Sequence, residues 1–140
     1  MKLKFKRLTD TAKIPAYAHA GDSGMDICAD ENVVLRPRTC LKISTGISAV
    51  IPDGYELQVR PRSGLASRGV VAAFGTVDCG YRGEIGVSLY NHTDGKVIVA
   101  KGDRIAQLVI APVVRADIEE TDDLGEATER GTNGFGSTGR

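Results

Sequence analysis

The feature that most constrains the fold of this chain is a series of short segments in which apolar and polar residues alternate. Residues 55–60 read Tyr-Glu-Leu-Gln-Val-Arg, and Ile85, Val87 and Leu89 repeat the pattern further along. A period of two places successive side chains on opposite faces of a strand. Short strands spaced by about 8–12 residues, with turn sequences between them, are typical of a sandwich or barrel, so we expect an all-β fold.

Turn sequences separate the expected strands. The sequence Pro-Asp-Gly at 52–54 follows the apolar stretch 43–51, which predicts a hairpin that continues into 55–60. Further turns are expected at 92–95 and 101–103. No window of ten or more residues carries a helical period of 3.6, and the one helical candidate is a turn or two after Pro61, with Ser63 as its cap.

Composition narrows the class of protein. The chain has 140 residues, which is one domain, and its 18 basic and 18 acidic side chains give a formal net charge of zero. Binding nucleic acid through its phosphates needs a cationic excess, so we expect no nucleic-acid partner. With four Tyr, three Phe and no Trp, the core is expected to be mostly Val, Ile, Leu and Ala. The 17 glycines are a larger fraction of the 140 residues than the usual share of about 7%, so their positions need an explanation.

Sequence features also indicate a compartment. The apolar run Leu108–Val114 contains a proline and is far shorter than the roughly 20 residues that span a bilayer. In a signal peptide an apolar stretch follows the basic N-terminus, and no such stretch follows the basic residues here. Cys28, Cys40 and Cys79 are an odd number with no Cys-x-x-Cys pair, so neither a disulfide framework nor a zinc ribbon is indicated. We therefore expect a cytoplasmic protein with no membrane partner.

The C-terminal quarter differs from the rest. Residues 117–129 hold seven acids and no base, and residues 130–140 are glycine-rich and polar. This predicts a barrel domain over 1–116, an acidic connecting segment over 117–129 and a flexible arm over 130–140. Composition alone describes such an arm as a disordered terminus.

The arm also carries a pattern with chemical meaning. Gly134, Gly136 and Gly139 form a Gly-x-Gly-x-x-Gly motif, but no strand precedes it and no helix can follow, so it is not a dinucleotide-binding fingerprint. Glycines let backbone N–H groups converge on one point, and Arg130 adds a permanent charge, as in an anion-binding nest. The hydroxyls of the neighbouring Ser and Thr add donors, and Phe135 has no evident core to enter, whereas stacking on a planar base would use it.

Two further segments are candidates for binding a phosphorylated ligand. The sequence Pro-Arg-Ser-Gly-Leu at 61–65 opens a helical turn whose N–H groups attract anions, although this feature alone favours an ordinary capped turn. In the glycine-rich stretch 75–86, which we expect to be a hairpin, a bare backbone edge could read the donors and acceptors of a pyrimidine. Asp78 in that stretch is a candidate general base acting on water, and the alternative is a surface turn.

Acidic residues suggest a cation, and the last apolar strand begins with two polar residues. Asp22, Asp26 and Asp30 lie within nine residues, and such clusters hold Mg²⁺ directly or through its waters, although Asx turns are an equal alternative. Arg104 and Gln107 lie at the start of the last apolar strand, where a charged residue is usually structural. The chain has no Gly-x-Ser-x-Gly motif, so an acyl hydrolase is not indicated.

Together and in this order, the segments resemble the trimeric deoxyuridine triphosphatase (dUTPase) family over essentially the whole chain. Five family motifs are matched, at 20–29, 61–66, 75–91, 102–108 and 130–139. The resemblance implies a jelly-roll-like β-barrel of the dUTPase type with one short helix, assembled as a homotrimer whose active sites are shared between subunits. It also implies hydrolysis of dUTP to dUMP and pyrophosphate, which keeps uracil out of DNA and supplies dUMP for dTMP synthesis.

The resemblance implies a role for each site residue. Asp78 would activate the water that attacks the α-phosphorus, and Tyr81 would pack under the deoxyribose and disfavour a ribose. Uracil would pair with the backbone of Gly75, Thr76, Val77 and Gly86. The phosphates would be held by Arg62, Ser63, Gly64 and Gln107.

The metal and the arm complete what the resemblance implies. Mg²⁺ would be held mainly by the substrate phosphates, with Asp26 acting on its water shell or at the trimer interface. The arm would close over a neighbouring subunit's nucleotide, with Phe135 on uracil and with Arg130, Gly136, Ser137 and Thr138 on the phosphates.

The chain departs from the family pattern at three positions, and two other activities remain open. Ala72 stands where many bacterial members have Asn, Asn133 where Gly is common, and Cys79 places a thiol beside Asp78. dCTP deaminase shares the fold but needs a different third motif, with a carboxylate acting on C4 of cytosine. A non-catalytic nucleotide sensor on the same barrel is the other alternative.

Overall fold

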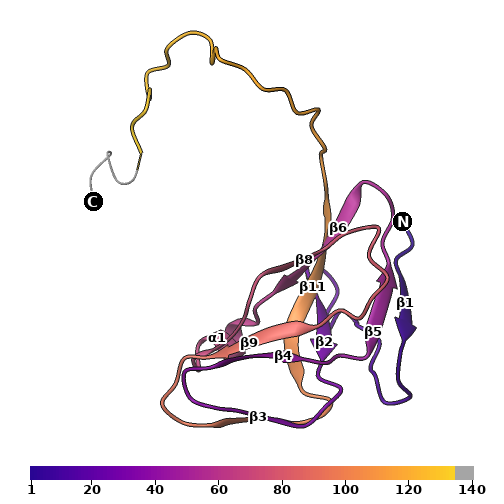
Figure 1. Ribbon diagram of the computed structural model, residues 1–140. Helices are drawn as coiled ribbons and strands as arrows, with labels where there is room; N and C mark the ends of the chain where they lie inside the picture. Colours follow the sequence, from indigo (N-terminus) through magenta and orange to yellow (C-terminus); the bar gives the residue numbers. More distant parts are fainter. Residues whose placement is uncertain (135–140) are drawn as a thin grey trace.

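The structure is a computed structural model, and it describes residues 1–134. Within that range the chain forms eleven strands and one short helix, as the alternating pattern predicts (Figure 1). The elements are β1 (Lys4–Arg7), β2 (Met25–Cys28), β3 (Val33–Leu35), β4 (Cys40–Ile43), β5 (Ile47–Val50), β6 (Tyr55–Arg60), α1 (Ser63–Ala66), β7 (Val70–Ala72), β8 (Gly75–Val77), β9 (Val87–Asn91), β10 (Val97–Val99) and β11 (Arg104–Pro112). In the described part of the chain, no helix is long and apolar enough to cross a membrane.

The strands form small antiparallel sheets around one core. The largest has the order β2-β11-β6-β8, a second has the order β4-β9-β7, and β1 pairs with β5 as β10 does with β3. The nine-residue strand β11 lies inside the largest sheet and pairs with β2 along one side and β6 along the other. This sheet therefore determines where the motifs on its outer strands can lie.

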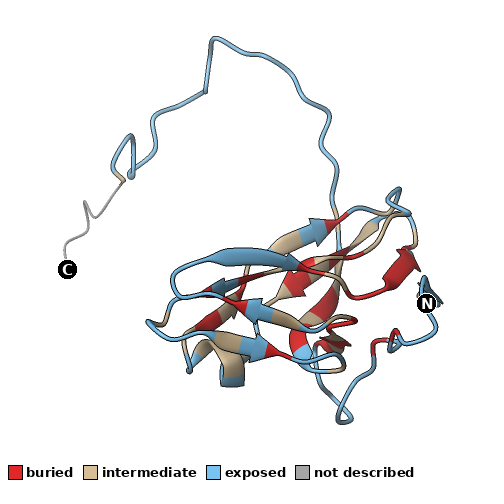
Figure 2. Cartoon of the chain, turned by 60° about the horizontal axis from the view of Figure 1, so that its bottom comes forward, coloured by how far each residue is buried: buried red, intermediate tan, exposed pale blue. Residues whose placement is uncertain are grey.

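The core is aliphatic, as the composition predicts. Its buried residues are all Ala, Val, Ile, Leu or Met, and they come from both larger sheets. Ile27, Leu57 and Leu108 project from the four-stranded sheet and Val87 and Leu89 from β9, each fully buried. Figure 2 shows buried segments alternating with intermediate or exposed ones along the strands. Burying each such side chain contributes about 1.5–3 kcal/mol, so the alternating pattern fixes which face of each strand turns inward.

The predicted hairpin around residues 52–54 was wrong in its pairing. The turn forms, with the Tyr55 N–H donating to the Pro52 carbonyl at 3.3 Å. However, β5 pairs with β1, whereas β6 pairs with β11 and β8. The turn therefore passes the chain from one sheet to another, because the hydrogen-bonding edges of both strands are taken by distant segments.

The short helix after Pro61 is present, but its predicted cap was wrong. Arg62 is the N-cap residue, in an extended conformation and without a side-chain capping bond. Ser63 is instead the first helical residue. The serine hydroxyl that does bond within this turn is that of Ser67, which donates to the Gly64 carbonyl at 3.2 Å.

Beyond β11 the chain leaves the body. The Val113 N–H donates to the Gly54 carbonyl at 2.8 Å, and Arg115 pairs with Asp53 at 3.7 Å. The residues that follow, up to 134, are almost all exposed and contain neither helix nor strand, and Figure 1 shows them running away from the sheets.

The position of Gly46 tolerates no side chain. It has a φ of +64°, and a Cβ there would lie 2.7 Å from Asp30 Oδ2 and 2.8 Å from the Ala12 Cβ. We expect Gly46→Ala to lower the free energy of unfolding by about 3 kcal/mol or more, because strain and overpacking add. Gly54→Ala is the matched control, since its φ is +77° but nothing lies within 4 Å, and it should cost only about 1–2 kcal/mol. Urea unfolding compares them, and equal losses would show that packing around Gly46 contributes nothing.

Candidate active site

The first candidate site is a hollow beside β8. It has a volume of about 240 Å³ and is lined by most of the residues predicted to meet a pyrimidine nucleoside. The predicted residues in its wall are Gly75, Thr76, Val77, Asp78, Tyr81 and Gly86. Lys42, Val59, Glu84 and Ile85 complete the lining.

The backbone of β8 has a free edge at this hollow. β8 is the last strand of its sheet and pairs only with β6, through Val59, Gln58 and Leu57. Backbone groups that alternate along its other side are therefore left without a strand partner. Such an edge can exchange hydrogen bonds with a planar ring that carries both donors and acceptors.

The predicted hairpin at 75–86 is not a two-stranded ladder. β8 belongs to the four-stranded sheet and β9 to the three-stranded sheet, so residues 78–86 form a connection between sheets. The reason is the same as at 52–54: the two strands find their partners elsewhere in the fold. The connection nevertheless brings its polar residues to the end of β8.

Tyr81 is held in place within this connection. Its hydroxyl donates to the Glu84 carbonyl at 3.0 Å, and its N–H donates to the Asp78 carbonyl at 3.0 Å. A Cβ on Gly83 would overlap the Tyr81 hydroxyl, so only glycine lets the ring lie there. The Arg82 guanidinium adds bonds to the carbonyls of Cys79 and Tyr81, at 2.7 and 2.8 Å. The residue predicted to meet the sugar is thus fixed from several sides.

Two of the departures from the family pattern have defined surroundings. Ala72 is only 2% exposed and belongs to the core in β7, and it does not line the hollow beside β8. The thiol of Cys79 lies 3.3 Å from an Arg115 nitrogen and 3.7 Å from Asp53 Oδ1. Cys79, which follows Asp78 in the sequence, therefore contacts the start of the C-terminal segment.

The second candidate site is a separate hollow of about 480 Å³. It is formed by the loop before β2, the N-terminal end of α1 and the start of β11. The predicted phosphate ligands Arg62, Ser63, Gly64 and Gln107 and the predicted metal residue Asp26 all line it. Arg68, Arg104, His19 and Asp22 are also in its wall, so three arginines surround the space.

Asp26 is part of an ion-pair cluster in this hollow. Its Oδ1 accepts from Arg62 Nε at 2.9 Å, and its Oδ2 accepts from Arg104 at 3.1 Å. A carboxylate can accept about four hydrogen bonds, so capacity remains for a water molecule. The contact fixes two guanidinium groups whose remaining N–H groups can meet a phosphate.

Gln107 and Gly24 complete the second hollow. Gln107 Nε2 donates to the Pro61 carbonyl at 2.9 Å, which ties β11 to the start of the α1 turn. A Cβ on Gly24 would overlap Gln107 Oε1, so the loop approaches this amide closely. The first N–H groups of a helix have no intrahelical acceptor, so those of Ser63 and Gly64 add donors.

The arrangement of possible metal-binding side chains shows whether the chain could hold a metal ion by itself. In residues 1–134, no three His, Cys, Asp or Glu side chains come close enough to hold a metal ion. Asp26 can therefore reach a magnesium ion only together with oxygens from another source, such as waters or a polyphosphate.

The two hollows have no lining residue in common. The hollow beside β8 is at one edge of the sheet β2-β11-β6-β8, whereas the other hollow is lined by residues of β2, the start of β11 and the segment that follows β6. The described part of the chain therefore carries two separate hollows.

Of the C-terminal arm the structure describes residues 130–134, and these line neither hollow. Arg130 is exposed and donates to the Asn133 carbonyl at 3.1 Å, within a local turn. The predicted contacts of Phe135, Gly136, Ser137 and Thr138 lie outside the described residues.

Several residues in the two hollows escaped sequence reasoning. Arg68 follows Gly64 by four residues, a helical spacing that could have placed it over the same turn. Lys42 gave no such signal, because its neighbours in the hollow come from distant segments of the chain. Glu84 lies within the stretch 75–86, but its hydrogen-bond partners at 44–46 are distant in the sequence.

Comparisons with known proteins agree on one family. A sequence model of the family described as dUTPase matches residues 10–139. Deoxyuridine 5'-triphosphate nucleotidohydrolases from Hydrogenobaculum sp. and Picosynechococcus sp. are 49% and 50% identical to this chain, with 99% of each chain covered. A solved structure of the Staphylococcus bacteriophage 80alpha dUTPase with dUPNHPP has a TM-score of 0.94 at 32% identity, with 99% of both chains covered. The fold class predicted from the sequence is confirmed by this similarity.

A second solved structure concerns a metal. A mutant of the dUTPase from phage phi11 of S. aureus has a TM-score of 0.85 at 27% identity, covering 90% of this chain and 100% of that one. It is described as revealing the coordination of a structural Mg(II) ion in that protein.

Two carboxylates near the first hollow predict acid sensitivity. The hydrogen bond from Thr9, with those from Thr11 and Lys101, lowers the pKa of Asp30 below its usual 3.8. Burial alone raises the pKa of Glu84, but hydrogen bonds from Ser44 and the backbone outweigh it and hold the pKa below its usual 4.5. The unfolded chain then binds more protons than the folded one, so the free energy of unfolding should fall as the pH drops below about 4.5.

Urea unfolding at a series of pH values measures this dependence. Asp30→Asn removes one of the two groups and should make the fall shallower below about pH 4. Unfolding free energies that stay level from about pH 6 to about pH 3 would contradict a folded-state role for these carboxylates.

Proposed function

The chain belongs to the dUTPase family, and from that premise we propose that two copies together form each of its active sites. Its relatives named above are nucleotidohydrolases, so its activity is that of a dUTP diphosphatase rather than of a deaminase or a non-catalytic sensor. The single observation that carries the shared-site proposal is that the two hollows are separate and have no lining residue in common.

The hollow beside β8 is the proposed uracil and sugar site. The free edge of Gly75–Val77 would pair with uracil, and Gly86 would approach it from the end of the connecting loop. A narrow space excludes the 5-methyl of thymine by contact, which a loose apolar pocket does poorly, since one methyl there is worth only about 1–3 kcal/mol. Tyr81 would lie under the deoxyribose and leave no space for a 2′-hydroxyl.

Asp78 is the proposed general base. It lines the hollow and is exposed to solvent, so a water molecule can lie between its carboxylate and a bound nucleotide. Asp78 would take a proton from that water as its oxygen bonds to the α-phosphorus. The bond from the α-phosphorus to the bridging oxygen then breaks, and pyrophosphate leaves with that electron pair.

The hollow around α1 is the proposed triphosphate site. Arg62, Ser63, Gly64 and Gln107 would hold the phosphates, and the position of Arg68 and Arg104 in the same wall supports adding them. Phosphoryl transfer depends mainly on positioning and on neutralising charge, and these groups supply both. The zero net charge of the chain is compatible with this role, because the cations are gathered at one place.

Magnesium is proposed to arrive with the substrate. The donor set described above cannot hold the ion alone, which supports a site made mainly by the phosphates, with Asp26 bound to a water of the ion. When bound, Mg²⁺ would neutralise phosphate charge and favour the leaving pyrophosphate.

We propose a homotrimer in which the arm completes each site. Closed rings of identical subunits join different surfaces of neighbouring copies, so the β8 edge of one copy can face the α1 hollow of the next. The exposed chain beyond Pro112 is long enough to reach another subunit, where Arg130 and the residues after it would close over the nucleotide.

The proposed cellular role follows from the reaction. Removing dUTP keeps uracil out of DNA, and the dUMP formed supplies dTMP synthesis. A cytoplasmic location suits the three free cysteines, Cys28, Cys40 and Cys79, because thiols stay reduced there.

Asp78→Asn tests the proposed base. The amide keeps the size of the side chain but cannot accept the proton, so we expect turnover of dUTP to fall by about 10²–10⁴-fold. The affinity for a dUTP analogue with an imido bridge should change little, because Asp78 acts on water. Pyrophosphate release and calorimetry measure the two quantities, and unchanged turnover would exclude Asp78 as the base.

Mixing two inactive variants tests the shared site. Asp78→Asn damages only the half-site beside β8, and Arg62→Gln damages only the half-site around α1. If the halves come from different copies, a mixture of equal amounts refolded together should recover activity at about a quarter of its sites. When the copies assemble at random, each of the two halves of a site is intact about half of the time. A mixture no more active than its two components would mean that both halves belong to one chain.

A further inference from the structure

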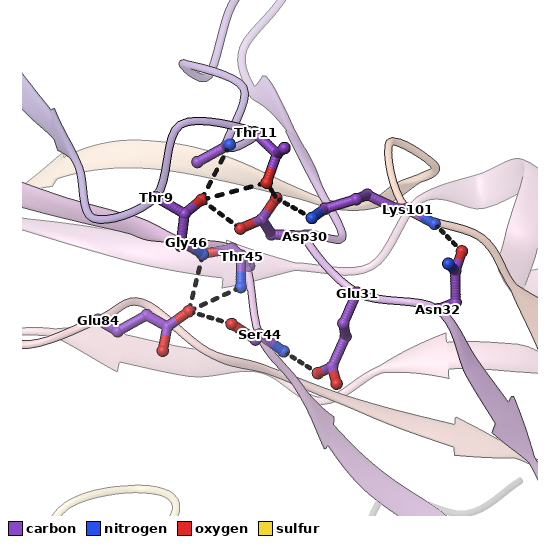
Figure 3. Close-up of polar contacts among 11 residues, drawn as sticks. Thr9, Thr11, Asp30, Glu31, Asn32, Ser44, Thr45, Gly46, Glu84 and Lys101 are labelled. Carbon is purple, nitrogen blue, oxygen red and sulfur yellow. Dashed lines mark hydrogen bonds and ion pairs between the residues drawn. The ribbon is translucent and has the colours of Figure 1, made fainter.

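Glu84 is a half-buried carboxylate that the proposed reaction does not use. It lies in the loop 78–86, and its Oε1 accepts three hydrogen bonds from residues on another part of the chain (Figure 3). The donors are Ser44 Oγ at 2.5 Å, the Gly46 N–H at 2.7 Å and the Thr45 N–H at 3.0 Å. One oxygen therefore binds the whole turn that joins β4 to β5.

Backbone contacts attach the same loop to β5. The Thr45 hydroxyl donates to the Ile85 carbonyl at 2.5 Å, and the Ile85 N–H donates to the Ile47 carbonyl at 2.8 Å. The Ser48 hydroxyl donates to the Arg82 carbonyl at 2.7 Å. Residues 82–85 are thus fixed along their length, and the contact made through a charged side chain is that of Glu84.

The turn that Glu84 binds is itself held from the other side. Asp30 accepts from the hydroxyls of Thr9 and Thr11 and pairs with Lys101 at 3.4 Å, and its N–H donates to the Ser44 carbonyl at 2.8 Å. Figure 3 shows the two carboxylates on opposite sides of residues 44–46. The turn therefore cannot shift to follow the loop, and Glu84 is attached to a fixed support.

One hydrogen bond connects Tyr81 to Glu84. The Tyr81 hydroxyl donates to the backbone carbonyl of Glu84 at 3.0 Å, while the side chain of the same residue holds the turn. The position of the Tyr81 ring is therefore tied to that of Glu84. Two residues farther along, Gly86 lines the same hollow, so a movement of Glu84 would reach both walls.

We propose that Glu84 is a positioning residue that determines how well the site distinguishes a deoxyribose from a ribose. It acts through Tyr81, by fixing the height of the ring beneath the sugar. The proposal rests on the proposed function, in which Tyr81 lies under the deoxyribose. A ring that settles lower by a fraction of an ångström would leave space for the 2′-hydroxyl.

Substitution of Glu84 tests this role. Glu84→Gln keeps the shape of the side chain but removes the charge that favours three donors at one oxygen. We expect kcat/KM for dUTP to fall by about tenfold while that for UTP falls less or rises, so that the dUTP to UTP ratio drops by about tenfold. The dissociation constants of dUMP and UMP, measured by calorimetry, should converge in the same way without any turnover.

Two further variants separate positioning from folding. Asp30→Asn is the matched control, because it weakens the side-chain contacts to Thr9, Thr11 and Lys101 but keeps the backbone hydrogen bond from residue 30 to the Ser44 carbonyl, which holds the turn. It should lower the Tm at least as much as Glu84→Gln and leave the dUTP to UTP ratio unchanged. Ser44→Ala keeps the carboxylate and removes one donor to it, so it should shift the ratio in the same direction by a smaller factor, and it carries the test if Glu84→Gln does not fold.

The outcomes are distinct. A ratio that stays at the wild-type value in Glu84→Gln and Ser44→Ala, whatever their Tm, would overturn the proposal. So would an equal loss of discrimination in Asp30→Asn, since the effect would then be general loosening. If the wild-type protein itself releases no pyrophosphate from dUTP, the proposed function fails instead, and the dUMP and UMP affinities still report on Glu84.

Discussion

The ladder between β6 and β11 is the constraint on which the rest of the structure depends. Six consecutive residue pairs, from Gln107 and Arg60 to Pro112 and Tyr55, hold these strands in the middle of the largest sheet. Their apolar side chains form much of the buried core, so a shift by one residue would turn them all outward. Because β2 and β8 add to the two outer sides of this pair, the ladder also positions the hollow beside β8 and the separate hollow that Asp26 and Gln107 line.

Charge is used locally in this protein. The acidic and basic side chains balance over the chain, yet each important carboxylate has its own set of partners. Asp26 joins two arginines in the phosphate hollow, whereas Asp30 and Glu84 bind hydroxyl and backbone donors on either side of residues 44–46. The first arrangement presents cations to a ligand. The second makes a rigid support for the loop that carries Asp78 and Tyr81.

Local signals in the sequence predicted segments that line both hollows, because turn residues and period-two alternation act over a few positions. The segments 61–65 and 75–86 line the two hollows, and the short helix is where Pro61 indicated it. Strand pairing could not be predicted in the same way, since it depends on which edges other strands leave free, and both expected hairpins were wrong for this reason. The partners of Glu84 lie about 40 positions earlier in the chain, and only the fold brings them together.

The central claim is that each active site is made by different copies of the chain. The most direct measurement is a crystal structure of the protein with Mg²⁺ and a dUTP analogue whose α,β-bridge is an imido group. The account predicts that the base lies against Gly75–Val77 of one copy while its phosphates lie against Arg62 and Ser63 of another. An analogue whose base and phosphates contact a single copy would contradict it.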